Sequence, residues 1–175
     1  MAQKFTRYHF GITINRIEVY VTNRTQNTET LRNIAAFSDL GEGEMFNTSI
    51  PGVTSRQNKT LPVDNQNNTL FRELRDSLKY PTLRKVNETV NTLETNLRMN
   101  RGRDFDMLRG AKKLTDREFT FNPQLGYISL ITPLRNDEIL SVSYEYTQNG
   151  IRHQVGELTE DYQSLANDKV LILKM

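Results

Sequence analysis

The side chains best suited to chemistry are few and far apart in this sequence. The two histidines, His9 and His153, are widely separated, and the chain contains no cysteine. A zinc site needs three or four such ligands at regular spacing, so neither histidine predicts a metal site. We also find no Gly-x-Ser-x-Gly elbow, no Walker-type loop and no dinucleotide fingerprint. We therefore expect no catalytic residues, no metal and no cofactor, and we expect His153 to be an exposed cross-strand partner in a hairpin.

Three neighbouring acids, Asp39, Glu42 and Glu44, are the next candidates for chemistry. Clustered carboxylates bind calcium or act as the acid and base of a hydrolase, and a hydrolase needs a concave pocket around them. The regular ligand spacing of an EF-hand is missing here. We favour solvated loop acids and keep the hydrolase as an alternative.

Aromatic side chains could instead stack against the flat face of a ligand. Tyr8, Tyr127, Tyr144 and Tyr146 are candidates for the sugar platform of a carbohydrate-binding module. Residues 4–10 interleave aromatic and basic side chains, as a single-stranded nucleic-acid site would, but an amphipathic strand shows the same pattern. The formal net charge is only +2, from 23 basic and 21 acidic residues, so we expect no nucleic-acid partner.

Positive charge is concentrated between residues 98 and 113. The candidate contact surface consists of Arg98, Arg101, Arg103, Arg109, Lys112 and Lys113. Nearby acids, Asp104 and Asp106 among them, favour a solvated helical face. The alternative is a docking surface for an acidic partner.

The first elements that must position these residues are strands. Residues 12–23 contain two alternating runs whose phase slips near Asn15 and Arg16, which predicts a strand with a bulge or bend. Residues 32–40 predict a shorter, buried strand that ends at a Gly-Glu-Gly turn. Residues 44–68 are polar without a sustained period, so we expect a functional or mobile surface loop.

The middle of the chain, residues 69–113, is expected to be helical. Asn68 or Thr69 caps a first helix, and residues 83–97 place apolar side chains three and four apart, as a helix packed on a sheet would. A short coiled coil is the alternative for that stripe. Gly102 is expected to end the second helix, and Asp104 to cap a third that runs through Phe105, Leu108 and Ala111.

The last segment, residues 117–174, is expected to be β-rich. Residues 118–122 and 127–131 flank a loop with Pro123 and Gly126, which predicts a hairpin. Asn149-Gly150 predicts a type I′ turn between two further strands, because both central residues need a positive φ. The fold class expected for 1–175 is therefore a single soluble α+β domain. It has a mainly antiparallel sheet with C-terminal β-hairpins and a central two- to three-helix insertion packed on the sheet.

The sequence shows no candidate for a membrane-spanning helix. No run approaches the roughly 18 apolar residues of a membrane helix. The apolar run at 170–175 stops without a polar tail, which favours a domain excised from a larger protein.

Four segments, in this order and spacing, carry a resemblance to a known family. They are RIEVYVTNR at 16–24, RNIAAFSDLGE at 32–42, AKKLTDREFTFNPQLGYISL at 111–130 and LSVSYEYTQNG with QVGE at 140–157. The chain resembles a soluble segment of the SprA/Sov family of Bacteroidetes, large outer-membrane proteins of type IX secretion and gliding motility.

The resemblance implies a non-catalytic structural or interaction domain of an outer-membrane protein-export channel. Expected partners are other parts of the same large chain, secretion-system subunits or secreted cargo, at the cell envelope on either side of the outer membrane. The resemblance supplies no catalytic residues. An envelope carbohydrate-binding or adhesion module is the alternative.

Overall fold

The computed structural model describes residues 11–24, 31–54, 62–123 and 125–175. Six strands form one sheet: β1 (Ile12–Val21), β2 (Leu31–Phe37), β3 (Phe105–Lys113), β6 (Leu140–Gln148), β7 (Ile151–Val155) and β8 (Val170–Lys174). Two more strands form a separate hairpin, β4 (Phe119–Asn122) and β5 (Tyr127–Leu130). The helices are α1 (Leu70–Ser77), α2 (Val86–Thr95) and the short 3₁₀ helix η1 (Thr159–Tyr162).

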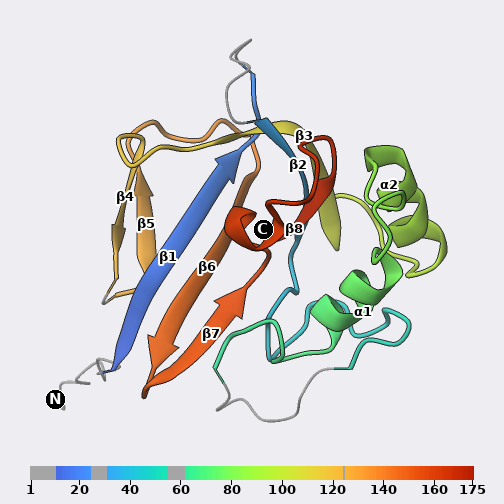
Figure 1. Cartoon of the computed structure of the whole chain (residues 1–175), viewed down its shortest axis with the longest axis horizontal. Coiled ribbons are helices and arrows are strands. Elements are labelled where there is room, and N and C mark those ends of the chain that lie inside the picture. Colours follow the sequence, from blue (N-terminus) through green and yellow to red (C-terminus); the bar gives the residue numbers. More distant parts are fainter. Residues whose placement is uncertain (1–10, 25–30, 55–61, 124) are drawn as a thin grey trace, which may run out of the picture.

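The sheet curls until its first strand meets a strand near its other end. Its order is β1-β3-β2-β8-β6-β7, and β1 also pairs with β6, which closes a five-stranded barrel with β7 as an added edge. Most neighbours are antiparallel, but β2 and β8 are parallel. The fold class that we predicted is therefore wrong. The chain is mostly β, 38% strand and 15% helix, and its described residues contain only two short α-helices (Figure 1).

The third predicted helix is the strand β3, and a bulge explains the error. The ladder between β2 and β3 shifts register between Arg32 and Ile34, opposite the segment that contains Gly110. Gly110 has φ +56° and its N–H donates to Asn33 Oδ1 at 3.0 Å. The extra residue of a bulge keeps Leu108 and Ala111 on the same face although they are three apart, a spacing that looks helical.

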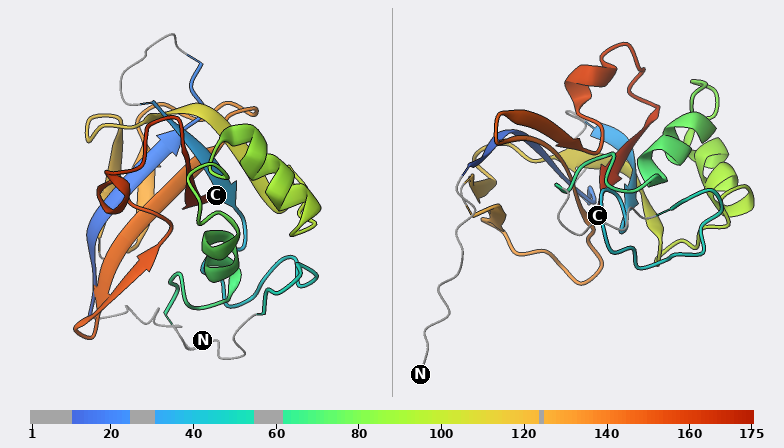
Figure 2. Two further views of the ribbon diagram at one scale, coloured as in Figure 1. Left: turned by 45° about the vertical axis from the view of Figure 1, so that its right-hand side comes forward. Right: turned by 90° about the horizontal axis from the view of Figure 1, so that it is seen from below.

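Side chains that alternate along the central strands pack into two separate hydrophobic clusters. Ala35 and Phe37 of β2 belong to one cluster, whereas Ile34 and Ala36 belong to the other. The first cluster takes in the apolar stripe of both helices, so the predicted stripe at 83–97 packs on the domain's own core. That cluster includes Leu70, Leu74, Leu78, Leu93 and Leu97. The views of Figures 1 and 2 show α1 and α2 on one flank of the barrel and the β4–β5 hairpin on the opposite flank.

Both predicted hairpins are confirmed. β6 and β7 pair from Gln148↔Ile151 onward, with φ of 50° at Asn149 and 79° at Gly150, as a type I′ turn requires. β4 and β5 pair with Phe119 opposite Leu130. The predicted irregularity in the first strand is also confirmed, as a register shift between Ile14 and Arg16.

Asparagine side chains hold the polar segment at 44–68 against the barrel, outside its residues 55–61, which lie beyond the described ranges. Asn68 Nδ2 donates to the backbone oxygens of Asp39 and Glu42 at 2.6 and 2.8 Å, and its Oδ1 accepts the Leu70 N–H at the start of α1. Of the two predicted caps, Thr69 occupies the N-cap position without a side-chain capping hydrogen bond, and Asn68, one residue earlier, accepts the hydrogen bond from Leu70. The amide-rich composition that suggested an open loop therefore serves internal hydrogen bonds here.

Candidate functional site

A groove of about 730 Å³ lies between the barrel and the β4–β5 hairpin. Strands β1 and β6 form one wall and β5 contributes to the other. Its apolar lining includes Ile12, Ile14, Ile17, Tyr127, Ile128, Val142, Tyr144 and Tyr146. We call this cavity the apolar groove.

The bulge in β1 explains how three isoleucines reach one wall. In a regular strand Ile14 and Ile17 would point to opposite faces, because side chains alternate with period two. The register shift at Asn15–Arg16 restores their common face. The phase slip was visible in the sequence, but nothing in the sequence indicated that it borders a groove.

Two of the candidate tyrosines belong to the floor of the groove rather than to its exposed surface. The rings of Tyr144 and Tyr146 lie 6.1 Å apart at 32°, and Tyr146 Oη donates to the Val63 carbonyl oxygen at 2.8 Å. Burial, with a contribution from Asp64, raises the pKa of Tyr146 to about 12. Burial also raises the pKa of Tyr144. Both hydroxyls therefore stay protonated at neutral pH. Of the four candidate tyrosines, Tyr127 is the one with a well-exposed ring, at 53%, and Tyr8 lies outside the described residues.

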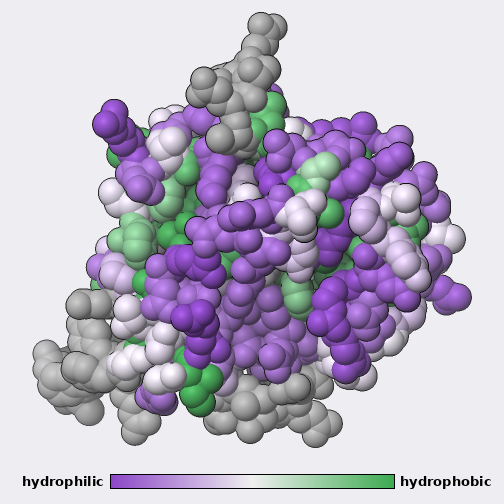
Figure 3. Space-filling model, viewed as in Figure 1, coloured by the Kyte–Doolittle hydropathy of each residue, from purple (hydrophilic) through white to green (hydrophobic). Residues whose placement is uncertain are grey.

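The hairpin beside the groove carries large apolar side chains in contact with water. Tyr127 and its neighbours Phe121, Leu125, Ile131 and Leu134 are between 38% and 64% exposed. In Figure 3, hydrophobic side chains gather on this flank, whereas most of the rest of this face is hydrophilic. Apolar side chains clustered beside a groove are typical of a surface that binds another molecule.

A second cavity, of about 670 Å³, is polar and lies among β7, α1, η1 and residues 64–69. We call it the polar pocket. His153 is part of its lining and is not the exposed residue that we predicted, because its side chain is only 10% exposed. Its Nδ1 lies 2.9 Å from Asp64 Oδ2, and its ring stacks on Tyr146 at 5.1 Å.

The three acids considered for hydrolysis do not meet in either cavity. Asp39 is 4% exposed, and its carboxylate accepts the backbone N–H groups of Phe46 and Asn47 at 2.6 and 2.9 Å. Glu42 forms an ion pair with Lys174. Asp39 is thus a buried turn-forming residue rather than a solvated one, and neither cavity is lined by Asp39, Glu42 or Glu44.

The predicted basic contact surface follows β3 and the turn before it. Its side chains mostly have partners close by in the fold. The ion pairs are Arg101–Asp106, Arg103–Asp104, Lys112–Glu118 and Lys113–Glu18, and Arg109 donates to Asn87 Oδ1. Lys112 and Lys113 are neighbours on a strand and point to opposite faces. Arg98 is exposed. Most of this positive charge is therefore balanced within the domain.

Several further observations bear on function. Among the described residues, no group of three or more His, Cys, Asp or Glu could hold a metal ion. In the same ranges, no helix is long and apolar enough to span a membrane.

No protein-family model matches the chain, and a search of the curated proteins returned no match.

Proposed function

We propose that the chain is a non-catalytic interaction domain that binds an extended polypeptide segment in the apolar groove. The observation that carries this proposal is the groove itself, flanked by a hairpin that exposes large apolar side chains. A soluble domain gains nothing in its own stability from leaving such side chains in water, whereas an interface uses them.

The hairpin favours an extended ligand. In the described part of the chain, β4 and β5 pair only with each other. The outer edge of each of these two strands therefore has no neighbouring strand among the described residues. A two-stranded hairpin is marginally stable alone in water, and an added strand extends its hydrogen-bonded ladder. Backbone pairing at an edge combined with apolar side chains entering the groove is the pattern of β-strand addition.

The sequence resemblance suggests in which larger protein and at which cellular location the domain acts. We propose that the domain belongs to an outer-membrane protein-export channel of type IX secretion and gliding motility, at the cell envelope. The partner would then be another part of the same chain, a secretion-system subunit or secreted cargo. Cell fractionation followed by immunodetection tests the location, and recovery in the cytosolic fraction would contradict it.

Site-specific photo-crosslinking tests the binding surface. A photoreactive phenylalanine analogue placed at Tyr127 in the full-length protein in its native cell should capture a polypeptide, to be identified by mass spectrometry. Tyr80 is the matched control, because it is equally exposed, at 57% against 53% for Tyr127. Crosslinks at Tyr127 that do not exceed those at Tyr80 would reject the groove as a polypeptide site.

A carbohydrate-binding or adhesion module is the second candidate, and Tyr127 favours it. An open tyrosine ring beside a groove offers a stacking surface for a sugar. Tyr146 is buried and Tyr144 is half-buried, and their rings pack against each other, so both offer less surface than Tyr127. Saturable binding of a neutral polysaccharide that disappears in Tyr127→Ala would favour this candidate over the first.

A further inference from the structure

The polar pocket is built from side chains that other contacts already hold in place. Asn65 exchanges two hydrogen bonds with the backbone of Gly156, at 3.1 and 2.8 Å. Gln154 Nε2 donates to Gly156 O at 3.0 Å and to Asp161 Oδ2 at 2.9 Å. Asp64 is held by His153 and by the Gln66 N–H. Ordered carboxamides and carboxylates of this kind bind a ligand without a large loss of side-chain entropy.

Positive charge reaches the pocket from two different elements. Arg72 and Arg75 stand three apart on α1 and so share one helix face, and Arg152 comes from β7. Among the described residues, Arg72 and Arg75 form ion pairs only with their sequence neighbours Glu73 and Asp76, at 3.4 and 3.3 Å. Arg152 is 74% exposed, and its Nε lies 3.6 Å from Glu145, outside hydrogen-bonding distance. These guanidinium groups therefore keep donors for an anion.

We propose that the polar pocket binds an acidic saccharide, with a uronic carboxylate on the arginines and the sugar hydroxyls on the carboxamides and acids. Hydroxyl groups donate and accept hydrogen bonds, and so match Asn65, Gln154 and Asp161, which together do both. A carboxylate matches the planar donors of arginine. Phe71 adds an apolar wall for the C–H face of a ring. A volume of about 670 Å³ lies within the usual range for small-ligand sites.

The acids in the lining favour a saccharide over an acidic peptide. A peptide rich in Glu or Asp would bring several carboxylates toward Asp64 and Asp161, which repel them. A saccharide with one carboxylate per ring presents mostly hydroxyl groups to those acids. This site is separate from the apolar groove, so its test does not depend on the function proposed above.

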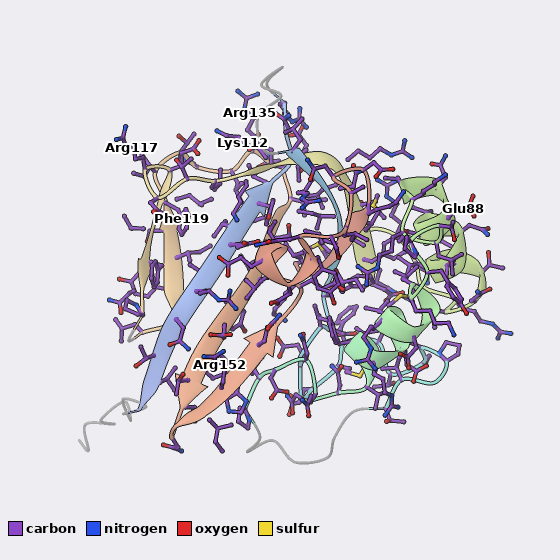
Figure 4. All side chains as sticks on the ribbon, viewed as in Figure 1. Glu88, Lys112, Arg117, Phe119, Arg135 and Arg152 are labelled. Carbon is purple, nitrogen blue, oxygen red and sulfur yellow. The ribbon has the colours of Figure 1, made fainter. Side chains whose placement is uncertain are left out.

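The test is isothermal titration of the 175-residue chain with tetragalacturonate. We expect saturable binding, and a loss of affinity of about tenfold in Arg152→Gln, as for removal of one charge-assisted hydrogen bond. Arg117→Gln is the matched control, because it makes the same charge change at an exposed arginine remote from Arg152 (Figure 4). Maltotetraose and tetraglutamate serve as the neutral and peptide comparators.

Each outcome decides the proposal. Binding of tetragalacturonate that is weakened by Arg152→Gln and not by Arg117→Gln supports it. No binding at about 1 mM, or equal weakening by both variants, overturns it. Equal affinity for tetraglutamate overturns the saccharide assignment, and equal affinity for maltotetraose overturns the role of the arginines. Loss of binding in Tyr127→Ala with Arg152→Gln unaffected would place the sugar in the apolar groove and overturn the proposal.

Discussion

The buried ion pair between Arg84 and Glu157 closes the gap between β6 and β8, and its removal should be severe. The two side chains are 5% and 0% exposed, and two N–H···O contacts of 2.7 and 2.8 Å join them. Strands β6 and β8 share only the pair Val142↔Lys174. Beyond it, the Ile172 N–H donates to Glu157 Oε2 at 2.9 Å, and the Val170 N–H donates to the Arg84 backbone oxygen at 2.8 Å.

The expected magnitude follows from this burial. Removing one partner leaves the other charged in the interior, which costs about 3–5 kcal/mol in free energy of unfolding. That is a large part of the roughly 5–15 kcal/mol that stabilises a typical domain. Burial alone would lower the pKa of Arg84, but Glu157 outweighs it and raises that pKa. Glu157→Gln removes this compensation, and the guanidinium, which proteins keep protonated, is then left charged and buried without its partner. Glu157→Gln and Arg84→Met should therefore each lose about 3–5 kcal/mol.

A double-mutant cycle measured by urea unfolding with circular dichroism distinguishes a coupled pair from two independent contacts. The double variant should recover most of the loss, because it removes both charges together. Arg75 with Asp76 is the matched control pair, at 56% and 61% exposure, and its cycle should yield less than about 1 kcal/mol. Single losses below about 1 kcal/mol, or a double loss equal to the sum of the two single losses, would refute the closing role of this pair.

Three further predictions concern single side chains. Burial alone would raise the pKa of Asp104, but hydrogen bonds led by Arg103 outweigh it and lower the pKa. The ionised Asp104 therefore stabilises the fold fully above its ordinary pKa of about 4, and this stabilisation is lost as the pH falls through its lower folded-state pKa. Below about pH 4, Tm of Asp104→Asn should decline less steeply than Tm of the parent chain, and equal slopes would contradict this. Gly110→Ala should cost about 1 kcal/mol in urea unfolding from its positive φ alone, because the new Cβ meets only Leu31 at 3.7 Å, and a cost above about 3 kcal/mol would contradict that origin. Leu74→Ala, on the buried face of α1, should cost about 2–5 kcal/mol in the same assay, and a loss below about 1 kcal/mol would show that this helix contributes little to the fold.

Features determined by neighbouring residues were predictable from the sequence. The turn at Asn149-Gly150 needs only its own two residues, since both must adopt positive φ. The β4–β5 hairpin and the stripe of α2 also follow from local spacing. Bulges break that local logic, because one extra residue changes the period of the side chains. In β3 the bulge produced a helix-like spacing, and a helix was wrongly predicted there. In β1 the bulge produced a visible phase slip, and an irregular strand was correctly predicted.

Barrel closure was not predictable, because it depends on contacts between distant segments. The parallel pairing places Val170 beside Asn33, and nothing in either strand specifies the other as its partner. The same holds for the polar pocket, whose arginines stand on α1 and β7 with ordinary surface spacing. The tyrosines of the groove were candidates from their residue type, but only the structure separates the buried Tyr146 and the half-buried Tyr144 from the exposed Tyr127.

Tyr146 joins the two cavities into one arrangement. Its ring lies between Tyr144, on the groove floor, and His153, in the polar pocket, with centroid distances of 6.1 and 5.1 Å. Its hydroxyl binds the backbone oxygen of Val63, which lines the groove, and the next residue, Asp64, binds His153 in the pocket. Tyr146 lines only the groove, but it contacts His153, which lines the pocket, so a groove ligand that moves the Tyr146 ring changes a contact of His153. By thermodynamic reciprocity, any effect of a groove ligand on affinity in the polar pocket must equal the effect of a pocket ligand on affinity in the groove.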